Sequence, residues 1–383
     1  MPKKPIYLDY AAATPLDKRV LKAQQPFFAE QFYNPSSPYQ AAKLVREAVN
    51  NARAQVGHWL GAKTSEVIFT AGATESINLA IAGVMLNHPG ANMLACSIEH
   101  EAVLAAARQF AHKFLPVKTD GTIDLEELKR SINDQTVLIS VGYANNEVGT
   151  IQPLSEVAGL VREVRRLRKL KNNMLPLYVH TDASQAACCL DLHASRLGVD
   201  LITLNGGKMY GPKQTGVLYV TSGVEIQPQI KGGGQEMGLR SGTENVAGII
   251  GLATALDIAQ NERKESVQKA TLLRDQLQAC LQTLPGIVFN GNQKRRLPNL
   301  LHLSLPSIDG ERLVMMLDEQ GVMASTGSAC AANKQTASHV LKALGLSSSL
   351  IAGSLRLTVG RQTSAKDIDK AAAIIIKTVE TLQ

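Results

Sequence analysis

The sequence predicts an α/β fold in which a large domain built on a mainly parallel sheet is joined to a smaller α+β domain. Two observations carry this prediction. Between about residues 66 and 220, short apolar runs alternate with helical stretches, a pattern typical of parallel strands connected by helices. After about residue 260 this alternation ends, and long polar helices enclose a few strands. We therefore expect a large domain over residues 15–259 and a small domain formed by residues 1–14 and 260–383.

Each expected element follows from a run of suitable residues. In the large domain, strands are expected at Glu66–Phe69, Asn92–Cys96, Val137–Val141, Leu177–Thr181, Leu201–Leu204 and Thr215–Val220. Helices separate most of them, for example over Ser76–Leu86 and Ala102–Phe114. In the small domain, we expect helices over Glu262–Leu284 and Ala365–Leu382, with strands at Ile287–Phe289, Leu300–Leu305, Gly321–Ala324 and Leu355–Val359.

Composition limits the class of protein. Of the 383 residues, 19% are charged and 45% are hydrophobic, as in ordinary soluble globular chains. No apolar run approaches the ~18 residues of a membrane span, and the N-terminus lacks the apolar stretch of a signal peptide. The five cysteines are few, odd in number and without metal-ligand spacing. We therefore expect a cytoplasmic protein with no metal site.

The net charge of +7 comes partly from one basic segment, residues 162–171. This segment is either the solvated end of a helix, where cations are favoured, or a docking face for RNA or an acidic partner. Aromatic residues are only 4% of the chain and none lies within the segment, so direct nucleic-acid binding is not expected.

The pair Asp182 and Lys208 gives the first indication of chemistry. Each residue follows an expected strand, and they are separated by one strand-helix step. A lysine at a strand end suits a Schiff base, and an acid one step earlier can pair with a protonated pyridine nitrogen. This arrangement is the one that a pyridoxal phosphate enzyme needs.

Other polar residues follow the neighbouring strands. The turn at residues 70–76 can offer backbone N–H groups to a phosphate, although it also reads as a simple helix cap. His100 can stack on a planar ring or serve a structural role, and Gln185 can reach the oxygen of such a ring. The glycine-rich residues 231–243 form either a hinge or an anion cradle. Ligands bind at the carboxyl ends of parallel strands, where these residues are expected.

Cys330 lies in a stretch of small residues, Ser325 to Ala332. Such a loop is pliable enough for a thiol to enter a site and leave it again, and the alternative is a small buried hydrophobic residue.

Taken together, these motifs make the chain resemble the cysteine desulfurases of the NifS/IscS kind, in the class V aminotransferase group of fold-type I pyridoxal phosphate enzymes. The resemblance covers nearly the whole chain. The matching segments are residues 7–14, 34–37, 72–75, 99–100, 145–147, 182–185, 208–212, 232–234, 240–243, 327–330 and 355–356.

The resemblance implies a role for each matching residue. Lys208 would carry the cofactor and move the substrate's α-proton, Asp182 would hold the pyridinium, and His100 would stack on the ring. The phosphate would be held by Ala73, Thr74 and Asn205, with Thr243 reaching it from a second subunit. The ring would be flanked by Asn146 and Gln185, and the substrate carboxylate would be bound by Asn34, Asn146 and Arg356. Cys330 would take sulfur from L-cysteine as a persulfide, releasing L-alanine.

The resemblance also implies a homodimer and a sulfur-acceptor protein, either an iron–sulfur scaffold or a tRNA-thiolation protein. The chain departs from the family at Asn205 and Gly207, where Ser and His are usual, and at Tyr39 and Ala42, where His and Gly are usual. These departures bear on cofactor affinity. The alternatives are a selenocysteine lyase or another class V enzyme such as an aminotransferase, and a non-catalytic sulfur-relay scaffold.

Overall fold

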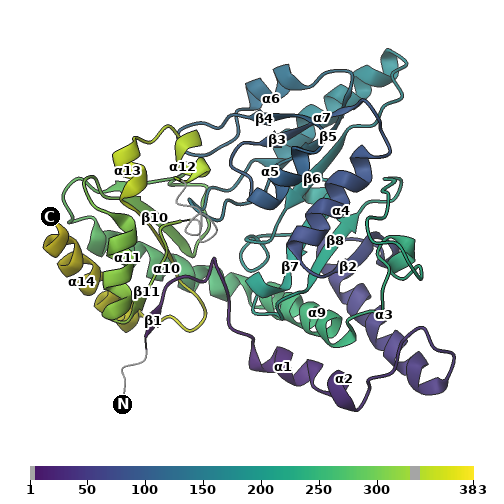
Figure 1. Ribbon diagram of the computed structural model, residues 1–383, viewed down its shortest axis with the longest axis horizontal. Helices are drawn as coiled ribbons and strands as arrows, with labels where there is room; N and C mark the ends of the chain where they lie inside the picture. The colour runs from purple at the N-terminus through teal and green to yellow at the C-terminus, as the bar shows by residue number, and fades with distance from the viewer. Residues whose placement is uncertain (1–4, 328–336) are drawn as a thin grey trace.

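The computed structural model describes residues 5–327 and 337–383, and its largest element is a seven-stranded sheet (Figure 1). The strand order is β2-β8-β7-β6-β5-β3-β4. Its strands are β2 (Val67–Thr70), β3 (Asn92–Cys96), β4 (Ala111–Leu115), β5 (Thr136–Ser140), β6 (Tyr178–Asp182), β7 (Leu201–Asn205) and β8 (Gly216–Val220). β8 runs antiparallel to both of its neighbours, while the other strands are parallel. The prediction of a mainly parallel sheet is confirmed.

Helices cover both faces of this sheet because its strands are apolar on both sides. α4 (Ala73–Met85) and α5 (Glu101–Ala107) pack on one face, and α3 (Gln40–Leu60), α7 (Leu154–Leu170) and α9 (Val246–Asn261) pack on the other. Consecutive side chains of a strand point to opposite faces. In β7, for example, Leu201 joins the core under α4, whereas Ile202 joins the core under α9.

One expected helix is wrong in its second half. The helix expected over Ala102–Phe114 ends at Ala107 as α5, and Ala111–Leu115 forms β4 instead. β4 pairs in parallel with β3, from Asn92↔Ala111 to Cys96↔Leu115. This pairing satisfies the backbone groups of the edge strand and overrides the local helix propensity.

A second core lies beside the large sheet. It contains a three-stranded antiparallel sheet of β12 (Ser354–Thr358), β10 (Leu300–Ser304) and β9 (Val288–Phe289). The helices α10 (Arg263–Leu281), α11 (Gly310–Glu319) and α14 (Ala365–Leu382) pack against it. The N-terminal strand β1 (Ile6–Tyr7) pairs in parallel with β11 (Val322–Met323), so the start of the chain also belongs to this core (Figure 1).

The remaining elements are short. They are the helices α1 (Lys18–Gln24), α2 (Pro26–Ala29), α6 (Leu125–Ser131), α8 (Ala194–Leu197), α12 (His339–Ala343) and α13 (Ser348–Ala352), and the 3-10 turns η1 (Thr64–Glu66), η2 (Gly206–Lys208) and η3 (Glu236–Gly238). Among the described residues, no helix combines the length and apolarity needed to span a membrane.

The basic segment at residues 162–171 lies on α7, and part of it is structural rather than solvated. Arg168 is only 4% exposed. Its guanidinium donates hydrogen bonds of 2.7–3.1 Å to the carbonyl oxygens of Asn133, Thr136, Leu175 and Pro176. Arg168 therefore joins the chain entering β5 to the chain entering β6, a role that neither interpretation of the basic segment included.

We predict that Arg168→Met lowers the free energy of unfolding by roughly 3 kcal/mol, because four carbonyl groups lose a charged donor. Arg166→Met is the matched control, since Arg166 is exposed on the same helix and its loss should cost no more than about 0.5 kcal/mol. Denaturant unfolding measures both values, and equal effects in the two variants would contradict the structural role of Arg168.

Candidate active site

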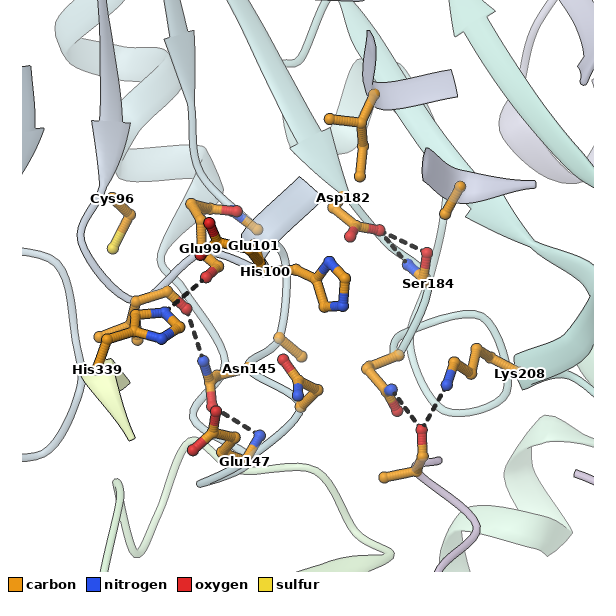
Figure 2. A pocket seen from close by; sticks show the side chains of 18 of the residues that line it. Cys96, Glu99, His100, Glu101, Asn145, Glu147, Asp182, Ser184, Lys208 and His339 are labelled. Atoms are coloured by element: carbon orange, nitrogen blue, oxygen red, sulfur yellow. Dashed lines mark hydrogen bonds between the residues drawn. The ribbon is translucent and has the colours of Figure 1, made fainter. Parts of the chain in front are cut away.

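A cavity of about 630 Å³ opens at the carboxyl ends of the parallel strands. This is the edge at which open α/β sheets bind ligands. Figure 2 shows His100, Asp182 and Lys208 around one part of it and Asn145, Glu147 and His339 around another. Nine of the residues expected to serve the site line this cavity, namely Ala73, Thr74, His100, Asn146, Asp182, Gln185, Asn205, Lys208 and Arg356.

Lys208 and Asp182 reach the cavity from neighbouring strands. Asp182 ends β6, and its Oδ1 accepts hydrogen bonds from the backbone N–H and the hydroxyl of Ser184, at 2.9 and 2.6 Å. Lys208 ends the turn η2 directly after β7. Its Nζ donates to the carbonyl oxygens of Ala11 and Ala12, at 2.9 and 2.6 Å. The N-terminal segment therefore forms one wall of the site, which sequence reasoning did not predict.

His100 is held by the start of the helix that follows it. It is the N-cap of α5, and its Nδ1 accepts a hydrogen bond from the backbone N–H of Ala102 at 3.1 Å. This bond fixes the ring so that its Nε2 side is directed away from the helix end. In Figure 2 the ring points into the space between Asp182 and Asn145.

The start of α4 gives one end of the cavity backbone donors suited to an anion. The helix begins at Ala73 after Gly72, whose φ of 142° is accessible to glycine and strained for other residues. No side chain caps this end, so N–H groups of its first turn remain available to an anion. Thr74 and Asn205 line the cavity there as well.

Gly207 leaves room beside this end of the cavity. A Cβ atom at this position would lie 3.4 Å from Asn205 Oδ1 and 3.6 Å from Lys213 Cγ, both ordinary contact distances. Asn205 Oδ1 accepts a hydrogen bond from the backbone N–H of Gly207 at 3.0 Å. The asparagine therefore shapes the turn that presents Lys208.

Arg356 approaches the cavity from β12 of the second core. It is 2% exposed, and its guanidinium makes two contacts. Nη1 donates to the carbonyl oxygen of Asn146 at 3.0 Å, and Nη2 pairs with Asp9 Oδ1 at 2.8 Å. The structure thus brings together Arg356 and Asn146, two of the three residues expected to bind a substrate carboxylate.

Three expected site residues are not placed in the cavity. Asn34 is exposed between α2 and α3, and its Oδ1 accepts from the backbone N–H of Ser36 at 2.9 Å. Thr243 lines a different cavity of about 250 Å³, together with Arg240 and Gly242. Cys330 lies outside the described residues. Ala337 and Ser338, which follow its segment, do line the main cavity.

Sequence reasoning assigned no role to three buried titratable groups next to the site. Glu99 accepts a hydrogen bond from the backbone N–H of Gly142 at 2.6 Å. Burial raises the pKa of the Glu99 carboxyl to about 8, which favours its protonated form. His180 lies between the hydroxyls of Ser140 and Thr203, and burial lowers the pKa of its imidazole to about 4. The third group is the carboxyl of Glu147. Glu99 lies in residues 99–100, one of the segments that match the family, but the sequence alone does not show that its carboxyl is buried.

Of the four cysteines in the described part of the chain, Cys96 is buried, and Cys188, Cys189 and Cys280 are partly exposed. Burial raises the pKa of Cys188 to about 11, and it also raises the pKa of Cys96 and Cys189. A thiol whose pKa is raised by burial supplies little thiolate at neutral pH.

Comparison with known proteins agrees with this geometry. The chain matches the family described as aminotransferase class-V over residues 6–371. It is 38% identical to the cysteine desulfurase IscS of Dictyoglomus turgidum over 389 residues, covering 100% of this chain and 96% of that protein. It is 39% identical to the cysteine desulfurase IscS of Methanosarcina thermophila, covering 99% and 93%.

The solved structures agree as well. A NifS-like protein superposes with a TM-score of 0.89 at 33% identity, covering 98% of this chain and 100% of that one. SspA in complex with cysteine superposes with a TM-score of 0.77 at 32% identity, covering 92% and 98%. The chain therefore belongs to the class V aminotransferase family. Its resemblance to the cysteine desulfurases of the NifS/IscS kind, its fold class and its use of pyridoxal phosphate are confirmed.

The residues present fit pyridoxal phosphate. One cavity combines an amine at Lys208, a fixed carboxylate at Asp182, an imidazole at His100 and an uncapped helix start at Ala73. These groups correspond to the aldehyde, the ring nitrogen, the ring face and the phosphate of the cofactor.

Proposed function

We propose that this enzyme removes sulfur from L-cysteine, releases L-alanine and holds the sulfur as a persulfide on Cys330. One observation carries the proposal. The cavity that combines Lys208, Asp182 and His100 also contains Arg356, and it is bordered by Ala337 and Ser338, which follow the segment carrying Cys330. A cofactor site, a carboxylate-binding group and the chain of the acceptor thiol therefore meet in one place.

The residues would divide the work as follows. Asp182 would pair with the ring nitrogen of pyridoxal phosphate, His100 would stack on the ring, and Lys208 would carry the cofactor covalently. The other cofactor contacts would come from Ala73, Thr74, Asn146, Gln185, Asn205 and Thr243. When bound, the cofactor would supply a ring that withdraws electrons from the substrate's α-carbon and so activates the bond between the neighbouring β-carbon and sulfur.

Arg356 would bind the substrate carboxylate, since its planar guanidinium matches a carboxylate and keeps its charge. Asn146 and Asn34 would also bind the substrate carboxylate. Lys208 Nζ would then move the α-proton, because an amine at the end of the turn η2 can approach the substrate's α-carbon.

In the sulfur-transfer step, the substrate's carbon–sulfur bond breaks and a sulfur–sulfur bond to Cys330 forms. A proton replaces sulfur on the carbon, so that L-cysteine and one thiol become L-alanine and one persulfide. The attacking species is a thiolate, which makes the raised pKa of Cys96, Cys188 and Cys189 a reason to exclude them as acceptors.

The alternatives receive less support. A non-catalytic scaffold would have no need for Lys208, Asp182 and the uncapped start of α4 in one cavity. No contact of the described residues favours selenocysteine over cysteine as substrate, or an amino-group transfer over sulfur removal.

We also propose a division into domains. Residues 15–259 would form the large domain, and residues 1–14 with 260–383 would form the small one. Support comes from the second core, in which Ile6 and Leu8 pack with residues between Leu273 and Leu382.

A homodimer is proposed because an apolar face is exposed on α1, α2, α3 and the chain between α2 and α3. Leu21, Phe28, Phe32 and Leu44 are each 51–65% exposed there, and the rings of Phe32 and Tyr33 stack at 4.6 Å. Apolar clusters of this kind mark interfaces. A second copy would also explain why Thr243 and Asn34 lie outside the cavity of their own chain.

The sulfur acceptor is proposed to be a cytoplasmic protein, either an iron–sulfur scaffold or a tRNA-thiolation protein. The support is the similarity to proteins described as cysteine desulfurase IscS. Transfer of labelled persulfide sulfur from the purified enzyme to each candidate acceptor would distinguish the two.

We predict that wild-type protein has twice the chain mass of 41.1 kDa in light scattering, and that Phe28→Ser with Phe32→Ser shifts it to one chain. Met174→Ser is the control, because Met174 is 91% exposed but lies after α7, outside this face. A monomeric wild type with full activity would refute the dimer.

We predict that Cys330→Ala lowers sulfide and alanine release by at least about 100-fold while the cofactor absorbance stays unchanged. Mass spectrometry of wild type after one turnover should find the added sulfur on the Cys330 peptide. Cys280→Ala, on α10, should retain full turnover. Undiminished turnover in Cys330→Ala, or a persulfide on Cys188 or Cys189, would exclude the proposed mechanism.

A further inference from the structure

The chain on both sides of residues 328–336 is fastened to residues of the active site. On the N-terminal side, Ser325 pairs with Arg356, whose backbone N–H donates to the Ser325 carbonyl oxygen at 2.7 Å. Ser354 on the same strand donates its hydroxyl to the carbonyl oxygen of Thr326 at 2.9 Å. This border is therefore held by β12, the strand that presents Arg356.

On the C-terminal side, two residues hold the chain. The hydroxyl of Ser338 donates to Glu147 Oε2 at 2.6 Å. The ring Nε2 of His339 lies 3.0 Å from the carbonyl oxygen of Glu99 (Figure 2). Ser338 also caps α12, because its Oγ accepts from the backbone N–H of Leu341 at 3.2 Å. The start of this helix thus depends on a hydroxyl that is itself held by Glu147.

Glu147 lies against the N-terminal border as well. A Cβ atom at Gly327 would be 3.3 Å from Glu147 Oε2 and 3.5 Å from His302 Nε2. Gly327 has a φ of 117°, which is accessible to glycine and strained for other residues. The backbone at Gly327 can therefore approach the carboxylate closely because it carries no side chain.

The carboxylate that joins these borders is itself firmly placed. Glu147 is 2% exposed, and its backbone N–H donates to Asn145 Oδ1 at 2.8 Å. It directly follows Asn146 in the loop after β5. Burial raises the pKa of its carboxyl, while the hydrogen bond from Ser338 and the charge of Arg356 act in the opposite direction. A carboxylate buried at such cost in solvation needs partners, and Ser338 is one of them.

We propose that Glu147 is a positioning residue for sulfur transfer, because its carboxylate binds the C-terminal border of the segment that carries Cys330 and lies against the N-terminal border at Gly327. This inference rests on the proposed function, in which Cys330 accepts the sulfur. Glu147 would act through Ser338 and Gly327 and would touch neither cofactor nor sulfur. Its loss should therefore slow the transfer step and leave cofactor and substrate binding intact.

The test compares Glu147→Gln, which keeps the size of the side chain, with Ser338→Ala, which removes the hydroxyl. Both should lower kcat for persulfide formation by about 10- to 100-fold, with the KM for L-cysteine within about twofold of wild type and cofactor content unchanged. Ser338→Thr keeps the hydroxyl and should restore most of the rate.

The matched control is Ser347→Ala. Ser347 caps the neighbouring helix α13 through the backbone N–H of Leu350, as Ser338 caps α12, but Glu147 accepts no hydrogen bond from it. Its loss should leave kcat unchanged. Unchanged kcat in both Glu147→Gln and Ser338→Ala would overturn the inference, and so would a loss expressed in KM or in cofactor content.

A second measurement separates this inference from the proposed function. Amide hydrogen exchange at Leu341 should accelerate by at least about tenfold in Glu147→Leu, because leucine offers no acceptor to the hydroxyl that caps α12. If wild-type enzyme forms no persulfide on Cys330, the proposed function fails, yet the exchange result still reports whether Glu147 holds this border. Unchanged exchange at Leu341 would contradict the anchoring itself.

Discussion

The buried guanidinium of Arg356 is the interaction on which the site depends. It belongs to β12 in the second core, yet it pairs with Asp9 of the N-terminal segment and with the carbonyl oxygen of Asn146 beside the large sheet. Three separate parts of the chain therefore meet at one cation. Since a buried charge is costly unless it is paired, these contacts fix how the second core sits against the strand ends. The cavity lies between the second core and the strand ends of the large sheet.

The walls of that cavity combine accessible and buried side chains. Lys208, Asp182 and His100 are accessible, whereas the carboxyls of Glu99 and Glu147, which also line the cavity, are buried and held by hydrogen bonds. These buried carboxyls place chain segments rather than reactive atoms. Glu99 holds Gly142 after β5, and Glu147 holds Ser338 before α12. Both carboxyls belong to the strand-end loops that also present His100 and Asn146, so cofactor binding and the placement of the thiol segment share one framework.

The sequence was sufficient to predict which residues lie at the strand ends, but it was insufficient to predict the contacts between distant segments. Asp182 and Lys208 could be placed together because parallel strands bring their carboxyl ends to one edge. The strand Ala111–Leu115 could not be predicted from its own residues, because its pairing with β3 decides its conformation. Likewise, the carbonyl oxygens of Asn133 and Thr136 held by Arg168 and the hydroxyl bound by Glu147 come from segments far away in the sequence. Asn34 and Thr243 lie outside the cavity of their own chain, and of the two only Thr243 is expected to act across subunits.

The central claim is that this framework holds pyridoxal phosphate on Lys208. Borohydride reduction of the purified enzyme, followed by peptide mapping, tests it most directly, because reduction makes the link between cofactor and lysine permanent. The account predicts a single pyridoxyl adduct on the peptide that contains Lys208, and no adduct in Lys208→Ala. An adduct on another lysine of the wild-type enzyme, or a wild-type enzyme that takes up no cofactor, would contradict it.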